Sequence, residues 1–88
     1  KTKKLQKNKK NIYILIGSFF SIDTAVFLRE RIIKDIPDLD SKKLIIKKIN
    51  NKQTQVISGP YTSVNLLKND YIKLKSFGFE ELDIFNNE

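Results

Sequence analysis

The 88-residue chain contains no cysteine and no histidine. Without cysteine it has no disulfide, no thiolate metal site and no cysteine nucleophile. Without histidine it lacks the commonest general base and zinc ligand. It also lacks any apolar run close to the roughly 20 residues that a membrane-spanning helix needs. These absences disfavour an enzyme and a membrane span, but missing cysteine does not identify a compartment.

Size and charge indicate one small, nearly neutral domain. A chain of this length with 40% apolar residues can bury one modest core, removing about 60% of its unfolded surface from water. The net charge is +7, yet six of the seventeen basic residues lie in the first ten positions, which hold no acid. From Asn11 onward, eleven basic residues face ten acidic ones, a net charge of +1. The charge therefore gives little support to nucleic-acid binding by the folded part.

Residues 1–10 are lysine-rich and contain one apolar residue, Leu5. Such a segment cannot offset the entropy of ordering, so we expect it to be a flexible linker end. An anchor for an anionic surface is the less favoured alternative. Because the chain starts at lysine and has no signal peptide, we also expect it to be part of a longer protein, with the domain at 11–88.

An internal repeat is the most informative pattern in the chain. The segment Gly17–Ala25 returns in chemical outline, 42 positions later, as Gly59–Leu67. Each copy has a glycine, an aromatic residue two places on, a serine suited to cap a helix, and an acid or amide two places after the serine. The repeat predicts two tandem units, each a strand followed by a turn and a helix.

The remaining patterns extend this prediction to the whole fold. We expect strands at 12–16, 44–49, 53–58 and 82–85. A loop is predicted at 36–41, and a turn at 50–52, whose residues tolerate positive φ. The first helix should be capped by Ser21 and end before Pro37, and the second should be capped by Ser63 or Thr62 and end at Gly78. The buried helix stripes are predicted to be Ala25, Leu28, Ile32 and Ile36, and Val64, Leu67, Tyr71 and Leu74. The order βαββαβ is typical of an α+β, ferredoxin-like fold. Both helices then cover one face of a four-stranded antiparallel sheet, with the first and third strands central.

Alternation along the central strands predicts which side chains the helices leave uncovered. Toward the helices we place Ile12, Ile14, Ile16, Thr54, Val56 and Ser58. Tyr13, Leu15, Gln55 and Ile57 then share the opposite face. An exposed apolar patch with a ring and an amide favours a binding surface. The alternative is that a flanking tail or a second copy of the chain covers this face.

Two phenylalanines follow the first strand. Phe19 matches Tyr61 in the repeat, so we expect it to close the core at the turn. Phe20 matches Thr62, so the repeat does not require its ring. Phe20 either projects to the rim of the open face or packs locally.

Three segments resemble the SPOR (sporulation-related repeat) family of bacterial cell-wall domains. They are Tyr13–Phe19 with Ala25 eight residues after the glycine, then Val56–Tyr61, then Leu74–Phe79. The likeness spans residues 11–86. It implies a βαββαβ fold and non-catalytic binding of septal peptidoglycan, through glycan strands stripped of their stem peptides. It also implies a place at the C-terminal end of a cell-division or other envelope protein, outside the cytoplasm, after a membrane anchor or signal and a linker.

The chain departs from the family at positions that contact glycan. Leu15 stands where members commonly carry glutamine, and Gln55 and Ile57 lie where they often have arginine. Either affinity is lower as a result, or contact depends on Tyr13, Ser18 and Phe20. The candidate glycan-binding residues are Tyr13, Leu15, Ser18, Phe20, Gln55 and Ile57. A sugar ring can lie on Tyr13 or Leu15, while Gln55 and Ser18 hydrogen-bond its polar groups.

Rival functions find less support in the sequence. An RNA recognition motif shares the βαββαβ order, and Tyr13 could stack a base, but the third strand, Gln53–Ser58, has no glycine or aromatic residue. Asp35, Asp38 and Asp40 lack the glycine and glutamate of a calcium loop, so we expect no metal, cofactor or catalytic centre. A ferredoxin-like oligomerisation or regulatory domain stays open, although we expect a monomer.

Overall fold

The structure is a computed structural model that describes residues 11–86. Its elements are β1 (Ile12–Phe19), α2 (Ile22–Asp35), the 3-10 helix η1 (Ser41–Lys43), β2 (Leu44–Asn50), β3 (Gln53–Tyr61), α3 (Val64–Phe77) and β4 (Asp83–Asn86). The four strands form one antiparallel sheet in the order β2-β3-β1-β4. The predicted α+β, ferredoxin-like fold is confirmed, with β1 and β3 at its centre. The prediction for residues 1–10 lies outside the described residues.

Both helices begin one residue after the serines that the repeat matches. The backbone N–H of Thr24 donates to Ser21 Oγ at 3.3 Å, and that of Leu66 donates to Ser63 Oγ at 3.2 Å. Each serine thus satisfies an amide that the first helical turn leaves without a partner. Helix α3 ends at Gly78, as predicted, where φ is +128°. A glycine adopts this conformation without the clash that a Cβ causes.

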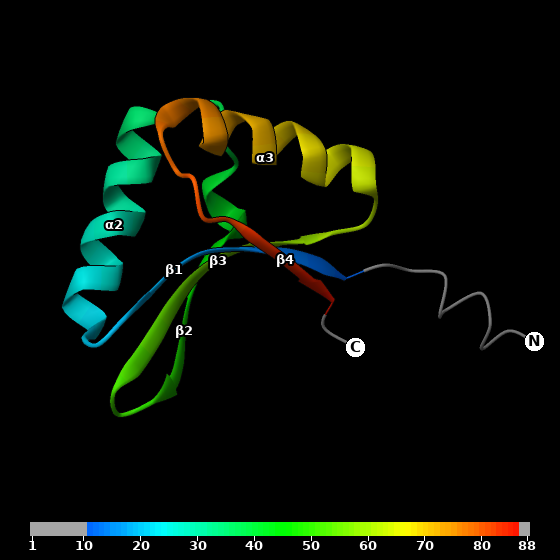
Figure 1. Cartoon of the computed structure of the whole chain (residues 1–88). Coiled ribbons are helices and arrows are strands. Elements are labelled where there is room, and N and C mark those ends of the chain that lie inside the picture. The colour runs from blue at the N-terminus through cyan, green and yellow to red at the C-terminus, as the bar shows by residue number, and fades with distance from the viewer. Residues whose placement is uncertain (1–10, 87–88) are drawn as a thin grey trace, which may run out of the picture.

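The helices lie on one side of the sheet and enclose the core between themselves and β1 and β3 (Figure 1). Helix α2 packs across β1, β2 and β3, and α3 packs across β1 and β3. No other element of the 11–86 range covers the opposite side of the sheet. Neither helix among the described residues is long and apolar enough to cross a membrane.

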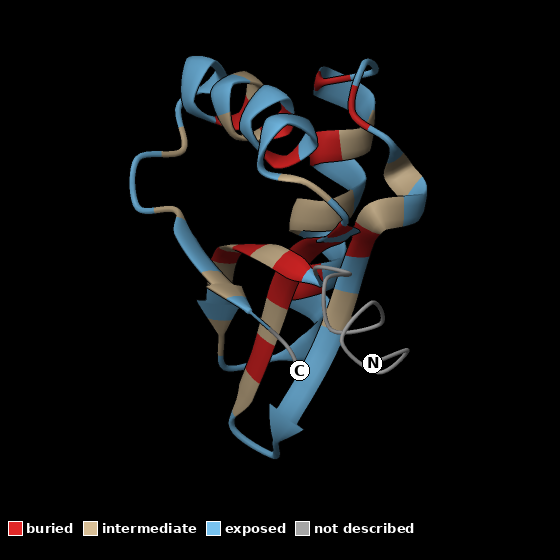
Figure 2. Cartoon of the chain, turned by 90° about the vertical axis from the view of Figure 1, so that its right-hand side faces the viewer, coloured by how far each residue is buried: buried red, intermediate tan, exposed pale blue. Residues whose placement is uncertain are grey.

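The core confirms most of the predicted inward positions. Its buried members include Ile12, Ile14, Ile16, Ala25, Ile32, Ile36, Val56, Leu67 and Leu74, with Leu28, Phe19 and Tyr71 packed against it. Buried and less buried residues alternate along β1 and along β3 as far as Val56 (Figure 2). Val64 was predicted wrongly, since it is 58% exposed. It is the first residue of α3, and the buried residues of this helix begin at Leu67.

Strand β3 is longer than predicted because it continues through Gly59 and Pro60 to Tyr61. An extra residue of β3 faces Tyr13 of β1 at this point, and the register shifts by one. Such a bulge keeps the strands paired while it reverses the face to which the following side chain points. Tyr61 therefore turns under the helices, where strict alternation would have placed it on the opposite face.

The β2–β3 turn differs from the expectation in its backbone. No non-glycine residue in the described range has a positive φ. Instead Asn50 Oδ1 accepts the backbone N–H of Lys52 at 2.8 Å, and the register shifts between Lys48 and Asn50. The asparagine side chain thus replaces the backbone hydrogen bond that a tighter turn would use.

The predicted loop at 36–41 is followed by η1, a short helix that the sequence analysis did not anticipate. Arg29 fixes it to α2, donating from Nε to the Leu44 carbonyl at 2.8 Å and from a terminal nitrogen to the Ser41 carbonyl at 3.2 Å. Asp40 caps it by accepting the N–H of Lys42 at 3.0 Å. The partly buried arginine thereby holds the start of β2 against the helix layer.

Candidate functional site

The uncovered side of the sheet carries five of the six predicted site residues. We call this side the open face. Register places Tyr13 opposite Phe85, Leu15 between Ile57 and Asp83, and Ser18 opposite Gln55. In β2, Ile45 lies beside Ile57, and Lys47 lies beside Gln55. The open face therefore has an aromatic end, an aliphatic middle and a polar, cationic end.

Ser18 reaches the open face because of a second bulge. Between Leu15 and Gly17, β1 has one residue more than β3, and beyond this point the alternation of β1 is reversed. Ser18 consequently joins Tyr13 and Leu15, while Phe19 turns toward the core. Strict alternation would have put Ser18 beneath the helices.

Tyr13 and Phe85 form a stacked pair at the aromatic end. Their ring centroids are 5.4 Å apart, with an angle of 15° between the ring planes. The Tyr13 ring also lies against Gly59, where an added Cβ would be 2.5 Å from Tyr13 Cδ2. Glycine at this position therefore provides the space that the ring occupies. The pair offers an amphipathic aromatic surface suited to the apolar face of a sugar ring.

Ile57 lies on the open face but contributes little accessible surface. It is only 4% exposed, although it does not belong to the core cluster beneath the helices. Its neighbours Leu15 and Ile45 flank it on the two adjacent strands. Ile57 thus supports the middle of the open face, and Leu15 and Ile45 are the side chains that a ligand would meet.

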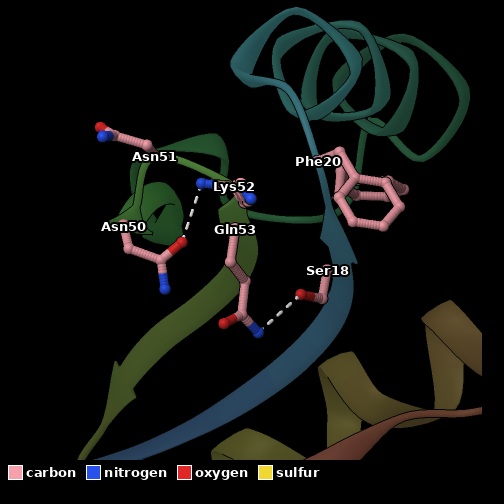
Figure 3. Close-up of a pocket in the computed structure, with 7 residues that line it drawn as sticks. Ser18, Phe20, Asn50, Asn51, Lys52 and Gln53 are labelled. Carbon is pink, nitrogen blue, oxygen red and sulfur yellow. Dashed lines mark hydrogen bonds between the residues drawn. The ribbon is translucent and has the colours of Figure 1, made fainter.

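Phe20 lies at the end of the sheet, next to the polar part of the open face. It is 85% exposed, which removes the alternative of local packing. Together with Ser18, Asn50, Lys52 and Gln53 it lines a hollow of about 610 Å³ between the β2–β3 turn and the end of β1 (Figure 3). Gln53 Nε2 donates to Ser18 Oγ at 3.0 Å and links the two sides.

A buried polar cluster lies on the other side of the sheet. The Tyr61 hydroxyl donates to Asp70 Oδ2 at 2.6 Å, so the contact with Ser58 Oγ, also 2.6 Å, has serine as donor. Burial, followed by the hydrogen bond to Asp70, raises the pKa of Tyr61 above its usual range. All three groups are satisfied by one another beneath the helices, so we assign this cluster to stability and not to ligand binding.

The outer side of α2 carries a second hollow, lined by Val26, Phe27 and charged residues including Glu30 and Lys34. Val26 and Phe27 are exposed there among charged side chains, and no hydrogen-bonding amide or hydroxyl group lines this hollow. Over residues 11–86, no three aspartate or glutamate side chains gather where they could hold a metal ion.

Comparison with protein-family models, with curated proteins and with solved structures gave no match. The function must therefore be argued from the chain itself.

The sequence analysis missed three residues of the open face, Ile45, Lys47 and Phe85. A signal for each was present, because alternation in β2 and β4 assigns them to a face once the strand order is known. Gln53 and Asn50 were missed for a different reason. Their role in the hollow depends on how the β2–β3 turn approaches the end of β1, and this approach depends on the bulges.

Proposed function

We propose that this chain is a non-catalytic peptidoglycan-binding domain of SPOR type. Its ligand is the glycan strand stripped of stem peptides, and it directs the envelope or cell-division protein that contains it to the septal wall. The observation that carries the proposal is the composition of the open face. A stacked aromatic pair, an aliphatic strip and a row of amide and hydroxyl groups lie side by side on one uncovered sheet.

The chemistry of the open face suits an N-acetylated sugar polymer. Tyr13 and Phe85 present ring surface to the C–H groups of a sugar, and Gln55 and Ser18 offer an amide and a hydroxyl to its acetamido and hydroxyl groups. Each such contact is weak, and association has a large entropic cost. A ligand that repeats the same unit along the sheet makes several contacts at once, which favours a polymer over a single sugar.

The motifs behind the SPOR resemblance also have positions that make structural sense. Gly17 and Gly59 both lie at bulges, and an aromatic residue two places after each turns toward the helices. Gly78 closes α3 between Phe77 and Phe79, whose rings stack with centroids 5.9 Å apart. These residues build the sheet and its edges, and their placement supports the resemblance without depending on the residues that contact ligand.

The proposal is tested by sedimentation with purified cell-wall sacculi before and after amidase treatment, which removes the stem peptides. We expect more of the protein in the pellet after treatment, because bare glycan then becomes accessible. Equal recovery in the supernatant under both conditions would overturn the proposal.

Tyr13→Ala assigns the binding to the open face. We expect the apparent affinity for amidase-treated sacculi, measured by pelleting, to fall by about 5- to 30-fold. This is the effect of losing one stacked aromatic contact worth about 1–2 kcal/mol. The circular dichroism spectrum should be retained. The control is Phe27→Ala, which removes an exposed ring from α2, on the other side of the sheet. Pelleting that is unchanged in the Tyr13 variant, or lost equally in both, contradicts this assignment.

A further inference from the structure

One end of the sheet combines exposed apolar side chains with lysines. It consists of the β2–β3 turn and the residues around the end of β1, and we call residues 18–22 and 47–53 the tip (Figure 1). Phe20 is 85% exposed there, and Ile49, which has no partner on β3, is 44% exposed. Phe20 shares one hollow with Asn50 and Lys52, so the two segments of the tip lie side by side (Figure 3).

Two hydrogen bonds hold the tip in shape. Gln53 Nε2 donates to Ser18 Oγ at 3.0 Å and ties the hairpin to the end of β1. Asn50 Oδ1 accepts the backbone N–H of Lys52 at 2.8 Å and fixes the turn itself. A partner that binds the tip is therefore spared the entropic cost of ordering a flexible loop.

The charge around the tip has one sign. Residues 41–69 contain six lysines and no acid, and three of these, Lys47, Lys48 and Lys52, are exposed on β2 and its turn. No salt bridge within residues 11–86 engages any of them. The acid closest to Phe20 along the chain, Asp23, lines the hollow on the outer side of α2. Lys47 lies on the open face and Lys48 on the opposite one, so the positive potential surrounds the end of the sheet and is not confined to one face.

We propose that the tip docks on an anionic lipid bilayer. Phe20 and Ile49 enter the boundary between headgroups and acyl chains, and the three lysines bind the lipid phosphates around them. The exposed apolar groups decide between a bilayer and a soluble anionic polymer. A polyphosphate would bind the lysines but leave Phe20 and Ile49 in water, whereas a bilayer removes both side chains from water.

This docking goes beyond the proposed glycan binding and does not rest on it. Phe20 lies seven residues beyond Tyr13 along the chain, which separates them by roughly 20 Å in an extended strand. Strand β1 begins and β4 ends at the opposite end of the sheet, where Ile12 pairs with Asn86. The aromatic pair on the open face and the tip can therefore be occupied at the same time.

Tryptophan fluorescence locates the contact. The chain contains no tryptophan, so Phe20→Trp introduces a single probe at the tip, and Phe27→Trp, at an exposed position of α2, is the matched control. Each variant is mixed with vesicles that carry brominated acyl chains. The vesicles contain either equal parts of phosphatidylglycerol and phosphatidylcholine or phosphatidylcholine alone. We expect the emission of the Phe20→Trp variant to shift to shorter wavelength and to be quenched on the anionic vesicles only, and that of the Phe27→Trp variant to stay unchanged.

Quenching is measured beside binding because residues 1–10 hold six lysines, which attract the same vesicles. In the Phe20→Trp background, Lys52→Gln should lower the partition coefficient onto anionic vesicles by about fivefold, the effect of one lysine near such a surface. Lys68→Gln, an exposed lysine on α3, is the control and should leave it within about twofold.

Three outcomes would overturn the proposal. They are absence of binding to the anionic vesicles, binding without quenching of the Phe20→Trp variant, and equal quenching of both tryptophan variants. Weaker binding of Lys52→Gln without quenching would identify the tip as a site for a soluble anionic polymer instead. None of these results changes the expected binding to amidase-treated sacculi, so the two proposals fail separately.

Discussion

Two glycines at bulges make room for aromatic rings, one on each side of the sheet. At Gly59 there is no space for a Cβ, because Tyr13 Cδ2 lies 2.5 Å from the position that a Cβ would take. At Gly17 the corresponding distance to Phe19 Cζ is 2.8 Å. Gly17 thus makes room for Phe19, the aromatic residue of its own repeat copy, whereas Gly59 makes room for Tyr13, which lies outside the repeat. The stacked position of the Tyr13 ring on the open face depends on the absence of a side chain at Gly59.

We predict that Gly59→Ala displaces the Tyr13 ring and weakens glycan binding as well as the fold. The control is Gly78→Ala. Both glycines have positive φ, but nothing lies within 4 Å of an added Cβ at Gly78. Strain in the backbone alone costs about 1–2 kcal/mol, and Gly59→Ala should exceed this by the cost of moving the ring. Urea unfolding measures the difference, and equal losses in the two variants would contradict the role given to Gly59.

Tyr61 gives the stability of the chain a dependence on pH. Its hydroxyl must stay neutral in the folded state, and its pKa is raised there by burial and by Asp70. A tyrosine in the unfolded chain ionises near pH 10. The stabilisation is therefore complete below about pH 10 and is lost as the pH rises further, by up to about 1.4 kcal/mol per pH unit.

We predict that Tyr61→Phe removes this alkaline loss. At pH 7 the variant should be less stable by about 1–3 kcal/mol, because Asp70 and Ser58 each lose a partner. Urea unfolding at several pH values from 7 to about 11 separates the two effects. A wild-type slope above pH 10 no steeper than that of the variant would show that Tyr61 does not titrate with unfolding.

The helices and strands were predictable where one local signal dominates. Ser21, Ser63 and Gly78 fix the helix ends through hydrogen bonds within a few residues, and the period of apolar residues fixes the buried sides. The bulges were not predictable, since an extra residue shows only when two strands are paired. For this reason the prediction ended β3 before Gly59, where the strand in fact continues to Tyr61.

For the candidate site, the sequence predicted the face of the sheet on which a side chain lies but not how exposed that side chain is. Alternation placed Tyr13, Leu15, Gln55 and Ile57 correctly on the open face. Nothing in one strand, however, reveals that Ile57, which has a strand on each side, is almost fully buried. Predicting the exposure of Phe20 and the hollow beside it would have required the relative positions of two turns that are far apart in the sequence.

At the scale of elements, truncating a side chain of α2 should destabilise the protein only on the side of the helix that packs against the sheet. Ile32 is fully buried against the sheet, whereas Phe27 is 66% exposed on the same helix. We predict that Ile32→Ala lowers the free energy of unfolding by about 2–5 kcal/mol through lost contacts and a cavity. Phe27→Ala should change it by less than about 0.5 kcal/mol. Thermal or urea unfolding decides this, and comparable losses would mean that the face of α2 is assigned wrongly.

For the whole molecule, the important question is what covers the open face in solution. Sheets with helices on one side commonly leave the other side to solvent, but an apolar patch can also pair two copies. We predict a monomer by sedimentation velocity at the concentrations used for glycan binding. A dimer that Tyr13→Arg dissociates would place a second chain on the open face and leave no room for a polymer.

The open face has no twofold symmetry of its own, even though the elements around it follow a repeat. Its rings lie toward one end and its lysines toward the other, with Asp83 beside Leu15 on the edge strand. A polysaccharide has a reducing and a non-reducing terminus, and under the proposed function such a surface would accept it in one direction only. Several copies bound along one strand would therefore all point the same way and carry the polarity of the polymer into the arrangement of the proteins attached to them.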